Sequence, residues 1–103
     1  MAVRVLMERH VVQGRELELN ALLRELRAKA LKQPGYLSGE TVVSADDPSL
    51  HLVISNWFTI KDWQGWERNP ERQEFIEKIS GLLETPPKTT VWLEQAGVAV
   101  AAL

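Results

Sequence analysis

The chain has 103 residues, of which 45% are hydrophobic and 25% are charged, and its formal net charge is −2. This length fits one domain, and the composition argues against a disordered chain and against a strongly basic surface for nucleic acid. The sequence contains no cysteine, which excludes disulfides, zinc–thiolate sites, iron–sulfur clusters and thiol nucleophiles.

The sequence predicts a cytoplasmic protein. An absence of cysteine suits a reducing compartment. Arg4, Glu8 and Arg9 interrupt the apolar residues of the N-terminus, so we expect no signal peptide. The longest uncharged apolar stretch, residues 97–103, is too short to span a bilayer. We therefore expect neither a membrane nor a nucleic acid as a partner.

The first 35 residues predict a strand followed by a helix. Residues 2–12 are rich in β-branched side chains and end at the turn signal Gln13-Gly14. Over residues 15–32 the apolar side chains recur at helical spacing, and Pro34-Gly35 then ends the helix. The stripe that we expect to be buried comprises Leu19, Leu22, Leu23, Leu26 and Ala30.

The next segment predicts a β-hairpin and the start of a short helix. Strands over residues 36–44 and 50–58 flank the turn sequence Asp46-Asp47-Pro48-Ser49. Thr59 can cap a helix that begins after it, with Asp62 at the third position as in a capping box.

A third helix and a fourth strand complete the prediction. Asn69-Pro70 begins the helix, because asparagine caps helices and proline suits their first turn, and Pro86-Pro87 ends the segment. Its apolar stripe comprises Phe75, Ile76, Ile79, Leu82 and Leu83. Residues 88–95 predict the last strand.

This order of elements predicts an α+β domain of the ferredoxin-like βαββααβ type. We expect a four-stranded antiparallel sheet with the helices on one face. No repeat or linker interrupts the chain, so we expect a single domain over residues 1–103, with its core in residues 1–96 and an apolar C-terminal tail over 97–103.

The predicted strands carry apolar residues on both faces, which predicts a homodimer. In the first strand Val3 and Val5 lie on one face, and Leu6 and Val12 lie on the other. Helices can cover only one face of such a sheet, and a second copy of the sheet can cover the other. A monomer with exposed apolar residues is the alternative.

A series of short motifs follows in order between Pro34 and Leu83. They are Pro-Gly-Tyr at 34–36, Ser-Asn-Trp at 55–57, a tryptophan at 66, and Asn-Pro-Glu-Arg at 69–72. Together with the order of elements, these motifs make the chain resemble the antibiotic biosynthesis monooxygenase domain family. The resemblance implies a dimeric α+β barrel with a pocket in each subunit between the sheet and the helices.

The resemblance also bears on cofactors. The haem-degrading branch of the family has an asparagine on the first strand, a tryptophan after the third, and a haem-ligating histidine further on. Trp66 matches the tryptophan, but an ungapped comparison puts the other two positions near Met7 and Ile76. The resemblance therefore does not extend haem degradation to this chain, and we expect no cofactor.

The residues that could carry chemistry are few. His10 and His51 are the only histidines, and neither has the spacing of a metal site. The sequence has no P-loop, GxGxxG or GxSxG motif. His51 could act as a base, although its position at the start of a strand favours exposure. Tyr36, after the Pro-Gly turn, is interpreted as structural.

An aromatic group and two polar residues are the candidate site. We predict that Trp66, Trp63, Phe75 and Met7 bind a flat substrate, although core or interface packing is the alternative, favoured for Trp57 and Trp63. Asn56 and Arg9 are the catalytic candidates, because an amide and a guanidinium could stabilise an aromatic anion. A strand-end hydrogen bond and a surface salt bridge are their structural alternatives.

Three functions remain open at this point. The resemblance implies a cofactor-independent monooxygenase that acts on a small aromatic or quinol-type molecule. A non-catalytic, small-ligand-binding or stress-associated dimeric domain of the same fold is the second. A dimerisation module with a filled pocket is the third.

Overall fold

The computed structural model describes residues 2–95, and the predicted tail over residues 97–103 lies outside them. The predicted order of elements is confirmed, with slightly narrower bounds. The elements are β1 (Val3–His10), α1 (Glu16–Ala30), β2 (Tyr36–Val43), β3 (Leu50–Trp57), α2 (Ile60–Glu67), α3 (Pro70–Ser80) and β4 (Lys88–Leu93).

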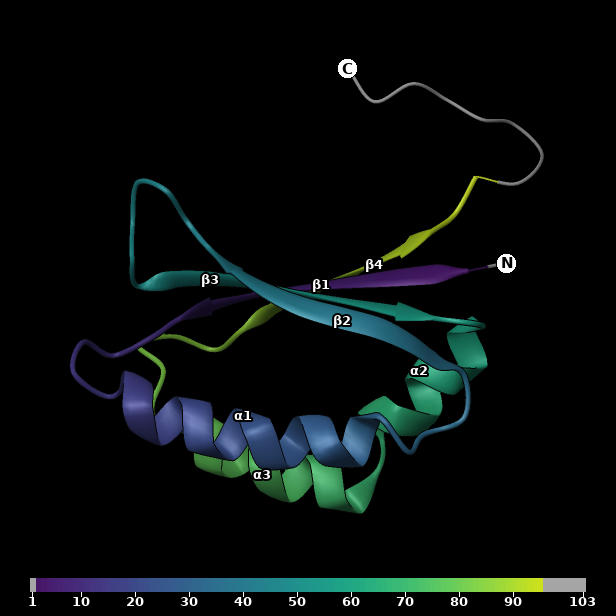
Figure 1. The fold of residues 1–103 in the computed structure, drawn as a ribbon, viewed down its shortest axis with the longest axis horizontal. Coiled ribbons are helices and arrows are strands. Elements are labelled where there is room, and N and C mark those ends of the chain that lie inside the picture. The colour runs from purple at the N-terminus through teal and green to yellow at the C-terminus, as the bar shows by residue number, and fades with distance from the viewer. Residues whose placement is uncertain (1, 96–103) are drawn as a thin grey trace.

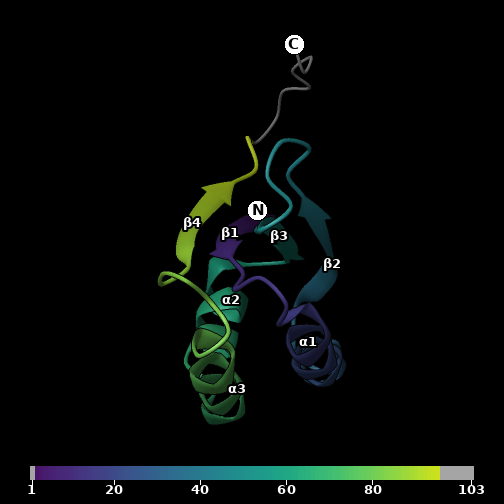
Figure 2. The same ribbon diagram turned by 90° about the vertical axis from the view of Figure 1, so that its left-hand side faces the viewer.

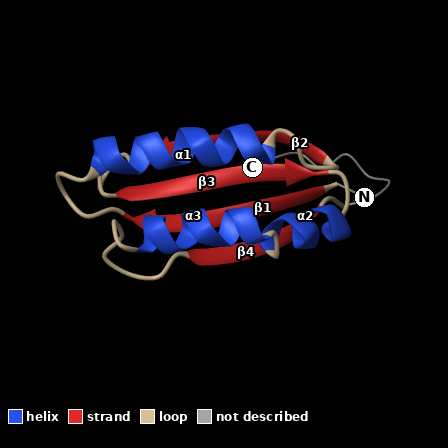
Figure 3. Ribbon diagram, turned by 90° about the horizontal axis from the view of Figure 1, so that it is seen from below, coloured by secondary structure: helices blue, strands red, loops and turns tan. Residues whose placement is uncertain are grey.

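The four strands form one antiparallel sheet in the order β2-β3-β1-β4. All three helices cover the same face of this sheet (Figure 1). Figures 2 and 3 show that α1 runs beneath the β2 side, while α2 and α3 run one after the other beneath the β4 side. The fold is thus the predicted ferredoxin-like α+β arrangement, with two parallel ridges of helix under a single sheet.

Local sequence explains where the second and third helices begin. The Thr59 hydroxyl accepts a hydrogen bond from the Asp62 amide at 3.1 Å, and the Asn69 side chain accepts one from the Glu71 amide at 2.9 Å. Pro70 occupies the first turn of α3. These caps satisfy amide groups that a helix leaves unpaired at its N-terminus, as the sequence predicts.

The Pro-Gly turn after α1 requires its glycine. Gly35 has a φ of +78°, which L side chains rarely adopt. A Cβ at this position would also overlap the side chain of Asp62 at the start of α2. The Gly35 carbonyl accepts a hydrogen bond from the Phe58 amide at 2.7 Å, so this turn joins α1 to the β3–α2 connection.

The face of the sheet toward the helices, called the inner face here, carries the core. Along β1 the residues alternate between buried and more exposed, with Val3, Val5 and Met7 on the inner face. Leu19 of α1 and Ile79 of α3 pack beneath them. The predicted stripes are buried only in part, because Leu22, Leu23 and Ile76 are half-buried at the edge of this core.

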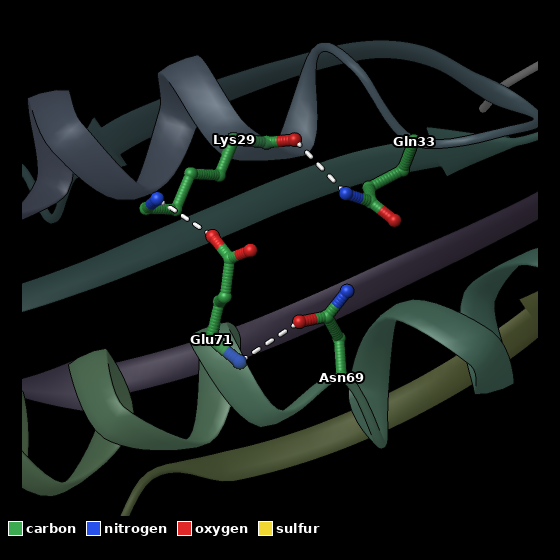
Figure 4. A network of polar contacts seen from close by, with 4 residues as sticks. All are labelled: Lys29, Gln33, Asn69 and Glu71. Carbon is green, nitrogen blue, oxygen red and sulfur yellow. Dashed lines mark hydrogen bonds and ion pairs between the residues drawn. The ribbon is translucent and has the colours of Figure 1, made fainter.

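A polar network links the two ridges of helix (Figure 4). The ammonium group of Lys29 on α1 pairs with the Glu71 carboxylate on α3 at 2.6 Å. The Gln33 side chain donates to the Lys29 carbonyl, and Asn69 caps α3 beside Glu71. The contact is thus an exposed polar link between α1 and α3.

The opposite face of the sheet, called the outer face here, is covered by no described element (Figure 1). Strand pairing places Leu6, Leu52, Ile54 and Trp92 on it together with polar residues. Trp92 is 57% exposed. None of the helices in residues 2–95 is long and apolar enough to cross a membrane.

Candidate active-site cavity

A cavity of about 690 Å³ lies between α1 and the inner face of the sheet. Residues of β1, β2, β3 and all three helices line it, whereas the described residues of β4 do not. The volume is that of a pocket for a small organic molecule. The cavity argues against the third predicted function, a dimerisation module whose pocket is filled.

One wall of the cavity is aromatic. Tyr36, Trp57, Trp63 and Trp66 all line it. The ring centroids of Tyr36 and Trp57 are 5.2 Å apart with an interplanar angle of 81°, and those of Trp57 and Trp63 are 5.9 Å apart at 60°. These edge-to-face contacts fix the rings against one another, so the wall is a preformed surface on which another ring can stack.

Tyr36 reaches this wall because of a bulge in β2. The bulge lies between Tyr36 and Ser38, and it places both Tyr36 and Gly39 on the inner face. The Tyr36 hydroxyl occupies the space beside Gly39, where an added Cβ would lie only 2.5 Å from it. Glycine at 39 therefore allows the tyrosine to lie along its own strand.

Arg9 is the most buried charged residue of the cavity. Its side chain belongs to the inner face of β1, where the strand register pairs it with His51 of β3, and Arg9 is only 4% exposed. Burial and the nearby Arg72 lower the pKa of Arg9 to about 10. The guanidinium is therefore still charged at neutral pH, and a cation faces the cavity.

Arg72 of α3 is a second buried cation that lines the cavity. Its guanidinium lies 5.3 Å from the ring centroid of Trp63 and donates a hydrogen bond to the Glu67 carbonyl at 3.3 Å. Burial lowers the pKa of Arg72, and Glu67 acts in the opposite direction. The contact with Trp63 holds this cation beside the aromatic wall.

Most of the residues predicted from sequence meet in this cavity. Trp66, Trp63, Met7 and Arg9 all line it. Ile76 lines the cavity beside Met7. These are the two residues near which the ungapped comparison puts the asparagine and the histidine of the haem-degrading branch.

Asn56 does not share the cavity with Arg9 and Trp66, and the expectation that it does is wrong. Asn56 lies on the outer face, where its side chain accepts a hydrogen bond from Arg4 at 3.1 Å and donates one to Ser38 at 3.0 Å. The physical reason is strand alternation, because the neighbouring Trp57 faces inward.

Phe75 is also absent from the cavity lining. It is buried in the core, and the ammonium groups of Lys78 and Lys29 lie 5.5 Å and 6.0 Å from its ring centroid. On α3 the residues that line the cavity are Arg72 and Ile76, which lie four positions apart on one side of the helix. Phe75 is therefore a packing residue in this fold.

Among the lining residues that the predicted site lacks, Arg72, Tyr36 and His51 carry a guanidinium, a phenol and an imidazole. The period of two along β3 places His51 on the same face as Trp57, so the sequence contained a signal for it. His51 is half-buried, where its place beside a turn had predicted exposure. For Arg72 and Tyr36 the signals were weaker, because a helix rotation and a bulge decide which way they point.

Comparison with known proteins identifies the family. The sequence model of the family described as antibiotic biosynthesis monooxygenase matches residues 2–78. The chain belongs to this family. No curated protein matches it in sequence.

Solved structures agree with the fold. A conserved protein from Methanosarcina mazei Go1 is 17% identical with a TM-score of 0.86, over 92% of this chain and 94% of that one. A putative antibiotic biosynthesis monooxygenase from Nitrosomonas europaea is 14% identical with a TM-score of 0.83, over 95% and 94%. SnoaB, a cofactor-independent oxygenase from Streptomyces nogalater, is 13% identical with a TM-score of 0.80, over 94% and 96%.

Residues 2–95 contain no group of three or more histidine, aspartate or glutamate side chains placed to hold a metal ion. The chemical groups of the lining include aromatic rings, guanidinium groups, one imidazole and one phenol, together with the Asn20 amide and the hydroxyls of Thr41 and Ser55. Such a set can stack a flat molecule and stabilise a negative charge on it.

Proposed function

We propose that this protein is a cofactor-independent monooxygenase that oxidises a small aromatic or quinol-type molecule in the cavity beneath the sheet. The observation that carries the proposal is the buried cation Arg9 in a cavity with a wall of three tryptophans. Membership in the monooxygenase family and the fold shared with a cofactor-independent oxygenase support it.

The proposed chemistry uses the substrate as its own reductant. His51, opposite Arg9 in the strand register, accepts the acidic proton of an anthrone or a hydroquinone. The resulting anion donates an electron to O2, and recombination of the two radicals forms a carbon–oxygen bond. For an anthrone, loss of water from the hydroperoxide leaves a quinone, so one oxygen atom enters the product and the other leaves as water.

In this scheme Arg9 stabilises the anion and Trp66 holds the ring. A fixed, buried cation favours the charged form of the substrate more strongly than solvent does. Loss of Arg9 should therefore slow turnover, whereas loss of Trp66 should mainly weaken binding.

The test is oxygen consumption with a panel of anthrones and hydroquinones. Wild type should exceed the uncatalysed rate, Arg9→Met should lower kcat by about 10- to 100-fold, and Trp66→Leu should raise KM. Arg68→Met, at an exposed arginine outside the cavity, is the matched control and should match wild type. With ¹⁸O2, the quinone formed from an anthrone should carry one labelled atom.

Two outcomes would contradict the proposal. One is an oxygen uptake equal to background for every substrate in wild type. The other is an equal rate in wild type and Arg9→Met. Binding of an aromatic ligand without oxygen uptake would favour the alternative, a non-catalytic ligand-binding domain of the same fold.

We also propose that the protein is a homodimer formed through the outer face of the sheet. That face carries Leu6, Leu52, Ile54 and Trp92 without any described cover. Apolar side chains on an uncovered sheet face of a small domain favour association, and an opposed second copy gives a closed, twofold-symmetric pair.

Light scattering after size exclusion should give about twice the chain mass of 11.7 kDa. Trp92→Glu should shift the protein toward monomer. Leu17→Glu is the matched control, because Leu17 is 82% exposed on α1, away from the sheet. A monomeric wild type at micromolar concentration, or an equal effect of both variants, would contradict the proposed interface.

A further inference from the structure

Two arginines of the cavity are buried without a carboxylate partner. Arg9 is 4% exposed and Arg72 is 7% exposed, and both line the same space. Within residues 2–95, neither guanidinium forms an ion pair with a carboxylate, and the Arg9 side chain makes no hydrogen bond. By contrast, the ion pairs of the described chain, such as Lys29 with Glu71, lie at the surface.

Such an arrangement is costly unless something else pairs with the charges. Arg9 loses its hydration on burial and gains no attraction in return. Arg72 is partly compensated, because it contacts the Trp63 ring, donates to the Glu67 carbonyl and is attracted by the Glu67 charge. The nearby charge of Arg72 adds to the cost at Arg9, since it also lowers the pKa of the Arg9 guanidinium. Among residues 2–95, the positive charge of Arg9 therefore has no partner, and it faces the cavity.

The rest of the cavity does not compensate for this charge. Arg24 and Arg27 of α1 also line it, at exposed positions. Among the described residues Glu40 is the only acidic residue of the lining, and strand alternation places its side chain on the outer face opposite Ile54. A low-dielectric cleft with charges of one sign raises the local concentration of a ligand with the opposite sign.

We infer that the ligand of this cavity is an aromatic carboxylate, held through its carboxylate group by Arg9 and Arg72. The planar fork of a guanidinium matches the two oxygens of a carboxylate, whereas a phenolate offers one oxygen. Arg72 already lies against the Trp63 ring, so a carboxylate bound there would place its own aromatic ring along the tryptophan wall.

This inference deepens the proposed function, on whose cavity and aromatic substrate it rests. It gives Arg9 a second role, because the guanidinium that stabilises the ring anion also helps to hold the carboxylate. A hydroxy- or oxo-substituted aromatic acid would carry one permanent negative charge on its carboxylate and a second on the ring oxygen once that is deprotonated. Two cations then match two negative charges at the moment of electron transfer to O2.

The experiment measures equilibrium binding without oxygen, so that turnover does not enter the result. The probes are 1-hydroxy-2-naphthoate, its methyl ester and 1-naphthol, titrated against tryptophan fluorescence and by calorimetry. Wild type should bind the acid about 10- to 100-fold more tightly than the ester. Added salt should lower this acid-to-ester ratio of affinities.

The variants assign the effect to the two arginines. Arg9→Met and Arg72→Met should each bring the acid-to-ester ratio down by about tenfold, while the affinity for 1-naphthol changes little. Arg9→Lys should give an intermediate ratio, because a lysine keeps the charge but lacks the fork. Arg68→Met should keep the wild-type ratio. If either methionine variant does not fold, the acid-to-ester affinity ratio of wild type and its salt dependence still test the inference.

Several results would overturn the inference. These are equal affinities of acid and ester for wild type, a ratio that neither methionine variant changes, and tighter binding of 1-naphthyl phosphate than of any carboxylate. Oxidation of neutral quinols with no preference for acids would overturn the inference and leave the proposed oxygenase standing. Tight binding of the acid with no oxygen uptake from any substrate would contradict the proposed oxygenase and leave the inference about the carboxylate standing.

Discussion

Arg4 and Arg9 lie on the same strand, on opposite faces of the sheet, and their surroundings differ. On the outer face, the exposed Arg4 donates to the Asn56 side chain, which in turn donates to Ser38. On the inner face, the buried Arg9 has no carboxylate partner within residues 2–95. On the outer face, the side chains of Arg4, Asn56 and Ser38 are thus paired with one another. The Arg9 guanidinium has no such partner, so we expect a ligand to bind on the inner face.

The largest expected effect is on the free energy of unfolding, when a buried tryptophan of the inner face is removed and compared with an exposed one of the outer face. Trp57, 1% exposed on the inner face, contacts both Tyr36 and Trp63, so Trp57→Ala should lower the free energy of unfolding by about 3–5 kcal/mol. Trp92→Ala on the outer face should lower the free energy of unfolding by less. Its effect should depend on protein concentration, because Trp92 lies in the proposed dimer interface. Urea unfolding at two concentrations measures both. Equal losses would contradict the distinction between the faces.

The second prediction compares the two arginines directly. Arg9→Met should raise the free energy of unfolding at pH 7 by about 1–3 kcal/mol, because it removes a buried unpaired charge and keeps the side-chain volume. Arg4→Met, at an exposed position, should change it by less than about 0.5 kcal/mol. The measurement is urea unfolding of both variants without ligand. A loss of stability in Arg9→Met would show that the cation already has a partner.

The pH dependence of this gain has a defined sign. The pKa of Arg9 is lowered to about 10 in the folded protein, so the unfolded chain binds the proton more tightly. The destabilisation of the folded protein by the Arg9 charge is therefore fully present below about pH 10 and decreases as the pH rises above that value. The difference between Arg9→Met and wild type should stay constant from about pH 6 to about pH 9 and narrow above about pH 10.

The third prediction concerns neighbouring residues of β2 that face opposite sides. Gly39→Ala should displace the Tyr36 ring, because the new Cβ would lie 2.5 Å from its hydroxyl, and should cost about 1–2 kcal/mol. Ser38→Ala loses one exposed hydrogen bond from Asn56 and should cost about 0.5 kcal/mol. Only Gly39→Ala should change the tryptophan fluorescence. An unchanged spectrum in that variant would mean that Tyr36 adapts without disturbing the wall.

The smallest expected effect is at the exposed pair that links α1 to α3. Lys29→Met should lower the urea midpoint slightly, and high salt should abolish the difference. The hydrogen bond with Lys29 lowers the pKa of Glu71, so the stabilisation is present above the unfolded pKa of that carboxyl and is lost as the pH falls through its folded pKa. A difference that survives high salt would indicate lost packing of the lysine stem.

The sequence was most informative where a structure depends on neighbouring residues. The caps at Thr59 and Asn69 and the Pro-Gly turn each require only a few adjacent residues, and all three form as predicted. The period of two would also have separated Asn56 from Trp57, because adjacent strand residues point to opposite faces. The prediction that Asn56 lines the cavity was wrong because it grouped residues by chemical type and did not consider which face of the sheet each one points toward.

By itself the sequence determined the order of elements, the single sheet, the apolar helix stripes and the family, because propensity, capping and periodicity are local properties. Only the tertiary structure decided which cations meet. Arg9 and Arg72 are far apart in the sequence, and they share a cavity because α3 packs beneath the β1 and β4 side of the sheet with one particular rotation about its axis. Packing of the whole core sets that rotation, and it turns Arg72 toward the cavity and Phe75 into the core.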